Sequence, residues 1–411
     1  MVCSLLSSPI SYLEKNKRPI LGLVITLYVL AGVIYSFYLG SNLRYLPDEL
    51  DYFTLASNLA FKGQYSLDGS QPTAYRPPGY PLFLAPLRLS GLNVIGLRMV
   101  NFFVLGLCIF ILYKILQERF SSPAGLIAAL LAALYPVVFY TAGTLYPQTL
   151  ASLLLILTLY LYTSEPAQNW KILLAGLLAG WLILTVPTFI FLLLVLAIWS
   201  WIYQRERITA RIFLLLVPAV LVVGAWSLRN FAVFNTFVFV STNSGENLLL
   251  GNSENTTPNG GRTIDFSSYE RQVAGLNEVQ RDQYYRDQAI SYIETHKLAS
   301  LKMYFLKLLN FFNYHNELAT NSEASTTSDI LLLVTFGPLL LLTLIRLALS
   351  KALPLTPFEI LLMAIYVAGA LVSAVFFTRI RFRVPLDFML IMIVGMFIGG
   401  ILMKREENMG W

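Results

Sequence analysis

Long apolar stretches alternate with short polar or charged connections along most of this 411-residue chain. A helix that crosses a membrane needs about 20 mostly apolar residues. The pattern predicts such helices at 19–40, 92–113, 124–142, 145–163, 171–185, 187–203, 212–228, 329–348, 358–377 and 385–403. Between 171 and 203 two alternatives stay open, because Thr185, Val186 and Pro187 form either a tight turn or a kink in one long helix. We therefore expect an all-α polytopic membrane protein with about ten transmembrane helices.

Two polar segments, 41–91 and 229–328, are too long to be simple turns between these helices. The first contains a Tyr-Arg-Pro-Pro-Gly-Tyr-Pro run at 75–81, which must be irregular because proline cannot continue a helical hydrogen-bond ladder. The second becomes helical in character from about 269 to 312. The chain is thus expected to form one transmembrane domain over 1–411, with two large outer loops that contain interfacial helices.

The end of the second loop has the pattern of a helix that lies flat on a membrane. Apolar and aromatic residues dominate 298–312, and Lys302 and Lys307 interrupt them. In an interfacial helix the apolar face enters the lipid boundary while the charged groups stay in water. We therefore expect both lysines to face water.

Composition agrees with a membrane protein, since 56% of the residues are hydrophobic and 13% are charged, against roughly a quarter charged in an ordinary soluble domain. The net charge of +6 comes from basic residues at the helix ends, with no basic stripe of the kind that binds nucleic acid. The positive-inside rule then predicts a multi-pass cell (inner) membrane protein with both termini in the cytoplasm and both long loops outside. The basic residues on the cytoplasmic side are Lys15, Lys17, Arg18, Lys114, Arg119, Lys171, Arg205, Arg207, Arg211, Arg346, Lys351, Lys404 and Arg405.

Cysteine and histidine are scarce. Cys3 and Cys108 are the only cysteines, so no disulfide framework is expected. His296 and His315 are the only histidines, and without a cluster of Cys and His they argue against a structural zinc site. No cofactor is identified from the sequence with certainty, and participation of a divalent metal ion stays open.

One short outer loop breaks the orientation rule, because Arg379, Arg381 and Arg383 alternate within 378–385. One explanation is anchoring to lipid headgroups. The other is an anion site, since guanidinium groups at a helix mouth pair bidentately with phosphate oxygens. On the second explanation, Arg76, Arg381 and Arg383 should converge on one phosphate-sized site.

Acidic residues follow the first membrane helix directly, as Asp48, Glu49 and Asp51. Acids in a first helical turn stabilise the helix without any further role. These carboxylates, however, lie on the same predicted side as Arg76 and the late arginines. A carboxylate opposite arginines is suited to deprotonate a hydroxyl while the arginines stabilise a departing phosphate.

Four motifs occur in an order and spacing that resembles a known family. They are Pro-Asp-Glu-Leu-Asp-Tyr at 47–52, Thr-Ala-Tyr-Arg-Pro-Pro-Gly-Tyr-Pro at 73–81, the run from Arg229-Asn230 to Gly251-Asn252, and Arg-Phe-Arg-Val-Pro at 381–385. Together they resemble bacterial C-type (GT-C) glycosyltransferases of the protein mannosyltransferase and lipid A aminoarabinose transferase superfamily. The resemblance covers most of the chain and implies a GT-C-like fold.

The resemblance also implies an activity: transfer of a sugar from a polyprenyl-phosphate donor to a hydroxyl of a glycan, lipid or protein acceptor, on the outer side and with inversion. In this family an Asp in the first outer loop is the catalytic acid/base, and Asp48 matches it, with Glu49 as its neighbour. A basic residue before the Pro-Pro pair contacts the lipid phosphate, and Arg76 occupies that place. Some relatives carry a second acidic residue where this chain has Gln148, so a second carboxylate stays unidentified.

Candidates for acceptor or sugar contacts are Tyr52, Tyr75, Glu246, Asn247 and Asn252. For the last three, formation of a turn is the competing explanation. Two other functions also stay open, a secondary transporter and a lipid-binding membrane protein without catalysis. Transporters place ionisable groups near the membrane midplane, whereas the predicted helices here are nearly free of charge. A transfer assay separates the lipid-binding protein from the enzyme.

Overall fold

The computed structural model describes residues 9–409 except 44–46, 262–263 and 316–325, and within these residues it contains helices and turns but no strand. The bundle consists of α1 (Pro9–Leu39), α4 (Val94–Arg119), α5 (Ser122–Ala133), α6 (Pro136–Ala142), α7 (Gln148–Tyr162), α8 (Asn169–Thr185), η1 (Pro187–Ile190), α9 (Phe191–Tyr203), α10 (Ile208–Phe234), α15 (Thr326–Ala348), η2 (Leu349–Lys351), α16 (Pro357–Val375) and α17 (Ile380–Met409). The long loops add α2 (Asp48–Lys62), α3 (Gly79–Leu89), α11 (Ser244–Leu250), α12 (Ser267–Gln272), α13 (Glu278–Thr295) and α14 (Lys297–Phe311). The prediction of an all-α protein is confirmed.

Six helices of the described chain, in α1, α4, α10, α15, α16 and α17, are long and apolar enough to cross a membrane, and α5 and α6 form a pair bent by 61° that could make a seventh. A multi-pass membrane protein is thus confirmed, but a count of ten spans is not. The stretches predicted at 145–163, 171–185 and 187–203 form apolar helices of no more than 17 residues. Such helices are shorter than the roughly 20 residues that a crossing needs.

Two breaks in the apolar stretches coincide with prolines. Helix α5 ends before Tyr135, and α6 starts at Pro136. Likewise α8 ends at Thr185, Val186 is extended, and the 3-10 turn η1 starts at Pro187. Proline has no N–H to donate and its ring clashes with the preceding turn, so the helix cannot continue through it. Of the two alternatives for 171–203, the structure therefore has a break between two helices.

Helix α17 forms the centre of the bundle. In the apolar part of α17, 72% of the residues are buried, whereas in the apolar part of α1 only 22% are buried. Around it pack α5, α7, α15 and α16. Because the first turns of α17 carry Arg381 and Arg383, the rigid centre of the bundle holds these arginines at the end of the bundle where α17 begins.

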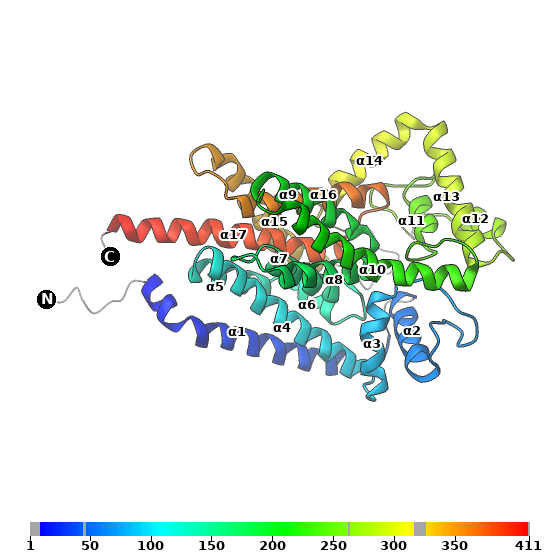
Figure 1. The fold of residues 1–411 in the computed structure, drawn as a ribbon, viewed down its shortest axis with the longest axis horizontal. Coiled ribbons are helices and arrows are strands. Elements are labelled where there is room, and N and C mark those ends of the chain that lie inside the picture. The colour runs from blue at the N-terminus through cyan, green and yellow to red at the C-terminus, as the bar shows by residue number, and fades with distance from the viewer. Residues whose placement is uncertain (1–8, 44–46, 262–263, 316–325, 410–411) are drawn as a thin grey trace.

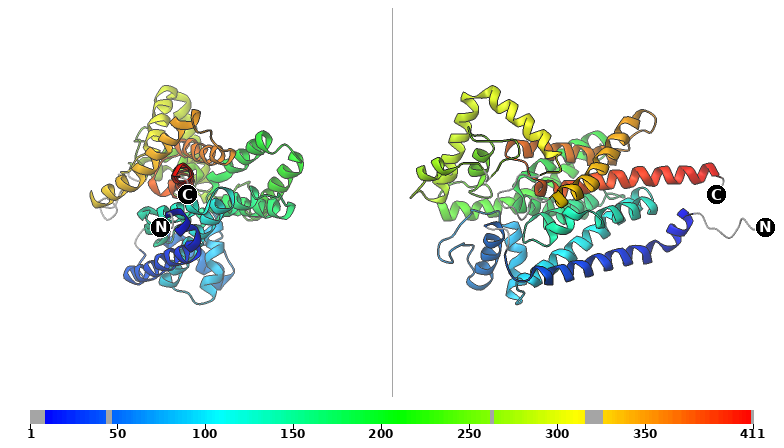
Figure 2. Two further views of the ribbon diagram at one scale, coloured as in Figure 1. Left: turned by 90° about the vertical axis from the view of Figure 1, so that its left-hand side faces the viewer. Right: turned by 180° about the vertical axis from the view of Figure 1, so that it is seen from behind.

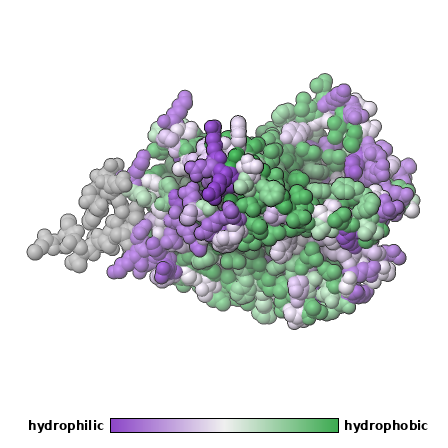
Figure 3. All heavy atoms as spheres, viewed as in Figure 1, coloured by the Kyte–Doolittle hydropathy of each residue, from purple (hydrophilic) through white to green (hydrophobic). Residues whose placement is uncertain are grey.

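The two ends of the molecule differ. The first residues of α1 and the last residues of α17 lie at one end, whereas α2, α3, α11, α12 and α13 gather at the other (Figures 1 and 2). On the face shown in Figure 3, hydrophobic residues cover most of the middle and hydrophilic residues gather toward both ends. This is the distribution that a protein in a bilayer needs. Which end faces the cytoplasm stays a prediction.

Helix α14 confirms the amphipathic helix predicted at 298–312, but one of its lysines does not face water. Exposed apolar residues follow one face, at Leu298, Leu301, Phe305 and Leu309, and Lys302 is exposed. Lys307 is fully buried. The expectation for Lys307 was wrong because its amino group finds carbonyl acceptors inside the protein, which replace its hydration.

Candidate active site

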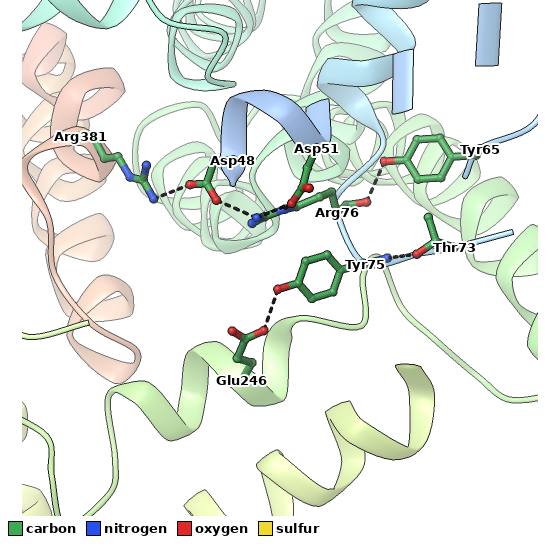
Figure 4. Close-up of polar contacts among 8 residues, drawn as sticks. All are labelled: Asp48, Asp51, Tyr65, Thr73, Tyr75, Arg76, Glu246 and Arg381. Carbon is green, nitrogen blue, oxygen red and sulfur yellow. Dashed lines mark hydrogen bonds and ion pairs between the residues drawn. The ribbon is translucent and has the colours of Figure 1, made fainter. Parts of the chain in front are cut away.

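The first turn of α2 presents two carboxylates on one face. Asp48, Glu49 and Asp51 occupy this turn, which follows Pro47. Side chains three positions apart on a helix share a face, whereas adjacent side chains diverge by about 100°. Asp48 and Asp51 therefore point to the same side, toward Arg76 of the Pro-rich loop (Figure 4). Glu49 points elsewhere, toward the Leu145 N–H.

Arg76 joins these two carboxylates. Its Nη2 lies 2.7 Å from Asp48 Oδ1 and 2.7 Å from Asp51 Oδ2, and its Nε donates to the same Asp51 oxygen at 2.9 Å. The side chain is only 9% exposed. Burial by itself would lower the pKa of the Arg76 guanidinium, but the neighbouring negative groups, Asp48 first among them, outweigh it and raise that pKa. Arg76 is thus a permanent, firmly held positive charge.

Arg381 reaches the other oxygen of Asp48. Its Nη2 donates to Asp48 Oδ2 at 2.8 Å across 333 positions of sequence. The guanidinium also lies 4.6 Å from the ring centroid of Tyr146, an arrangement that favours a cation. With 34% of its side chain exposed, Arg381 is more accessible than Arg76. Asp48 is therefore held between a buried arginine and an accessible one.

The backbone of the Pro-rich loop is tied down on several sides. Glu278, the first residue of α13, accepts from Thr73 Oγ1 at 2.5 Å and from the Ala74 N–H at 2.8 Å. Tyr65 donates its hydroxyl to the Arg76 carbonyl at 2.8 Å. Because proline leaves this segment without a helical ladder, side chains from both long loops supply its hydrogen bonds instead. These bonds fix where Tyr75 and Arg76 point.

Tyr75 links the first long loop to the second. Its hydroxyl donates to Glu246 Oε2 at 2.9 Å, and the Arg76 guanidinium lies 4.9 Å from its ring centroid. Glu246 and Asn247 are half-buried in the first turns of α11. Figure 4 shows the resulting row of side chains, from Arg381 through Asp48, Arg76 and Tyr75 to Glu246.

Tyr52 lies behind this row. Its side chain is buried, its ring packs edge-on against Tyr80, and the Arg76 guanidinium lies 5.8 Å from its ring centroid. Burial raises the pKa of the Tyr52 phenol to about 12. Tyr52 thus stays neutral at physiological pH, and its ring packs near the Arg76 guanidinium.

Glu49 does not belong to the cluster, although the sequence analysis paired it with Asp48. It is fully buried, accepts from the Leu145 N–H at 2.8 Å, and lies 3.5 Å from the Arg98 guanidinium. Arg98 in turn donates to the carbonyls of Gly40 and Asn42. Glu49 therefore lies apart from Asp48, because its position in α2 turns it into the protein.

Arg383 is likewise turned away from Asp48. It is fully buried, lies 3.0 Å from Asp387, and donates to the carbonyls of Phe311 and Asn313. Residues two positions apart in a helix diverge by about 200°, so Arg381 and Arg383 cannot face the same way. The prediction that three arginines share one site is therefore wrong for Arg383. Arg76 and Arg381 do come together, because both contact Asp48.

Asn252 also lies elsewhere. Its amide donates to the carbonyls of Leu248 and Val375. It therefore connects α11 with the end of α16 rather than lining the row around Asp48.

Two members of the cluster went unassigned in the sequence, Asp51 and Tyr146. The three-residue spacing from Asp48 could have identified Asp51. Tyr146 lies just before Pro147 and the start of α7, and only the folded chain shows that it meets Arg381. In the described part of the chain, no three His, Cys, Asp or Glu residues gather in a way that could hold a metal ion.

Comparison with known proteins gives one family match. The family described as dolichyl-phosphate-mannose-protein mannosyltransferase matches residues 75–227, from Tyr75 in the Pro-rich loop to α10. The predicted resemblance is confirmed over this segment. No curated protein matches the chain.

Among solved structures, the chain is similar to ArnT from Cupriavidus metallidurans. The crystal structure of that protein bound to undecaprenyl phosphate has 16% identity and a TM-score of 0.43, with 92% of this chain and 76% of that chain covered. The apo structure has 13% identity and a TM-score of 0.40, with 92% and 75% covered.

Proposed function

We propose that this protein is a membrane glycosyltransferase that moves a sugar from a polyprenyl-phosphate donor to an acceptor hydroxyl on the outer side of the cell membrane. The observation that carries the proposal is Asp48, held between Arg76 and Arg381 at the end of the bundle away from both termini. The family match over residues 75–227 supports the same class of enzyme.

In the proposed reaction Asp48 is the general base. The acceptor oxygen attacks the anomeric carbon, its proton passes to the Asp48 carboxylate, and the bond from the anomeric carbon to the phosphate oxygen breaks. The electron pair of that bond leaves with the polyprenyl phosphate. Attack opposite the leaving group inverts the configuration at the sugar.

The two arginines have different parts in this reaction. The leaving phosphate gains negative charge, which guanidinium groups stabilise by charge-assisted hydrogen bonds. Arg76 is fixed by Asp51, whereas Arg381 is more exposed and has Asp48 as its acidic partner. A phosphate would therefore compete with Asp48 for Arg381. When the phosphate binds Arg381, Asp48 Oδ2 loses its contact with that cation. The pKa of the Asp48 carboxyl then rises, and the carboxylate becomes a better base.

The acceptor is proposed to bind on the side of Tyr75 and Glu246. Asn247 follows Glu246 in α11, and Tyr52 contacts this side through Arg76. A carboxylate and a phenol offer an acceptor and a donor for sugar or protein hydroxyls. Glu246, rather than Glu49, adds a further carboxylate to the site beside Asp48 and Asp51. The acceptor is proposed to be a glycan, lipid or protein within reach of the membrane surface.

The proposed topology puts residues 1–411 in one transmembrane domain, with loops 41–91 and 229–328 outside and both termini in the cytoplasm. The gathering of α2, α3 and α11 to α13 at one end of the bundle supports it. A membrane-impermeant thiol reagent should label cysteines placed at Ser70 and Ser267 in intact cells. If the reagent labelled these cysteines only after cell lysis, both loops would lie on the cytoplasmic side and the proposed orientation would be wrong.

A secondary transporter has one observation in its favour, the fully buried Arg383 and Asp387 pair in the first turns of α17. Asp387 lies near the start of the span predicted at 385–403. Transporter sites use such groups. Uptake into proteoliposomes, measured beside transfer, distinguishes the two functions.

The central test is Asp48→Asn in the purified protein, assayed for transfer from a panel of polyprenyl-phosphate sugars. Asparagine keeps the size of the side chain but cannot hold the proton, so the rate should fall about 10²–10⁴-fold. Asp287→Asn, which makes the same change at an exposed position of α13, is the matched control. Equal transfer by Asp48→Asn and the wild type would remove Asp48 from the chemistry.

A further inference from the structure

Lys307 is a buried cation whose contacts are all neutral. Its side chain is fully buried, and its Nζ donates to the Gly251 carbonyl at 2.7 Å and to the Phe376 carbonyl at 2.8 Å. The Val375 carbonyl and Asn252 Oδ1 lie farther off, at 3.4 Å each. No carboxylate forms an ion pair with it in the part of the chain that the structure describes. Burial accordingly lowers the pKa of the Lys307 amino group to about 8.

The acceptors of Lys307 share a position, the carboxyl end of a helix. Gly251 follows the last residue of α11, and Val375 and Phe376 end α16. The last carbonyls of a helix have no partner within it and carry partial negative charge. A cation placed between two such ends satisfies both and joins the helices. This explains how a lysine is tolerated at a buried position.

Neighbouring contacts make the junction rigid. Asn252 donates to the Val375 carbonyl at 2.9 Å, and Asn310 donates to Thr378 Oγ1 at 2.9 Å. Thr378 Oγ1 in turn donates to the Lys307 carbonyl at 3.2 Å. Gly251 approaches α16 so closely that a Cβ there would lie 1.7 Å from the Phe376 carbonyl oxygen. The junction thus excludes any larger residue at 251.

The segment held by this junction leads straight to Arg381. Segment 375–378 comprises the last residue of α16 and most of its connection to α17, and Arg381 is the second residue of α17. We propose that Lys307 is a positioning residue, which fixes segment 375–378 so that Arg381 reaches the proposed phosphate site beside Asp48. This inference rests on the proposed function. It also gives Gly251 and Asn252, which belong to the sequence motif, a role outside the acceptor site.

The experiment measures the affinity of the full-length protein in nanodiscs for undecaprenyl phosphate. Arg381→Gln removes the charge at the site, and Lys307→Met removes the charge at the junction. Lys302→Met makes the identical substitution at an exposed position of the same helix and is the matched control. Losing a charge-assisted hydrogen bond weakens binding about tenfold. We expect about that loss for Arg381→Gln, a loss of similar size for Lys307→Met, and less than about a twofold change for Lys302→Met.

The double variant decides whether Lys307 acts through Arg381. If it does, Lys307→Met should weaken binding little further once Arg381 is glutamine, since coupled residues are not additive. Additive losses, or wild-type affinity in Lys307→Met, would overturn the inference while leaving the phosphate site intact. Wild-type affinity in Arg381→Gln would overturn both the phosphate site and the inference.

Lys307→Met could fail to fold, which size-exclusion chromatography and thermal melting would reveal. Thr378→Val then takes its place in the same double-variant comparison. It removes the bonds to Lys307 and Asn310 with little change in size. A loss of affinity that disappears in the Arg381→Gln background supports the junction, and an additive loss or none overturns it.

Discussion

Two clusters of arginine and aspartate stand close together along α17, and they differ in what surrounds them. In the first, Asp48 is 16% exposed and Arg381 is 34% exposed. In the second, both Arg383 and Asp387 are fully buried. The first is assembled from three distant segments of the chain, whereas the second is a pair one helical turn apart.

The partners of the two aspartates explain the difference. Asp387 accepts from the hydroxyls of Tyr135 at 2.7 Å and Tyr366 at 3.4 Å, besides Arg383. Asp48 is held by two arginines, of which one is accessible. A carboxylate enclosed by fixed donors is a structural anchor, but one whose partner can turn to another anion is suited to chemistry. Identical residue types therefore have different surroundings in the two clusters, and we expect different roles for them.

The largest effect on stability is expected from the buried cluster. Arg383→Met leaves Asp387 as an uncompensated buried charge, which typically costs about 3–5 kcal/mol. The melting temperature in detergent should fall clearly, and expression should fall with it. If the protein melted like the wild type, Arg383 would not be the anchor of α17 and the contrast between the clusters would fail.

A smaller and different effect is expected at the cluster around Asp48, where Arg381 is partly exposed. Arg381→Lys keeps the positive charge but loses the forked geometry that suits phosphate, so affinity for undecaprenyl phosphate should fall about three- to tenfold. The melting temperature should barely change, because the side chain is partly exposed. A large loss of stability without a loss of affinity would make Arg381 an anchor like Arg383.

Glu49→Gln distinguishes the two neighbouring acids of α2. Glu49 is buried against Arg98 and the Leu145 N–H, so the change should lower the melting temperature while the folded fraction keeps transferring sugar. Activity per folded molecule, compared with Asp48→Asn, provides the measurement. Loss of transfer in a stably folded Glu49→Gln protein would return this residue to the chemistry.

The smallest effect is expected where the two long loops meet. Tyr75→Phe removes the hydrogen bond to Glu246 but keeps the ring that lies against Arg76. A single hydrogen bond to a charged group contributes about 1.5–3 kcal/mol, much of which water can replace at a half-exposed position. We expect the KM for the acceptor to rise a few-fold, with donor affinity unchanged. A change confined to donor affinity would place Tyr75 on the phosphate side.

Much of the fold follows from local pattern. Runs of apolar residues form helices wherever the chain meets lipid, because every backbone group must then be satisfied within the segment. The two long loops and the amphipathic helix α14 are equally local, since helical periodicity depends only on neighbours along the chain. At Pro187 proline chemistry predicted an interruption but left open whether it was a turn or a kink. The sequence also identified Asp48, Arg76 and Arg381 by residue type and by resemblance.

Tertiary structure decided which of two neighbouring candidates faces the cluster around Asp48. Asp48 rather than Glu49, and Arg381 rather than Arg383, reach the cluster, because the rotation of α2 and α17 about their axes is set by packing and not by composition. Lys307 shows the same limit: periodicity assigned it to water, but two helix ends distant in sequence supply the carbonyls that bury it. Residue types and their spacing thus follow from the sequence, while the direction of each side chain depends on the partners that folding brings to it.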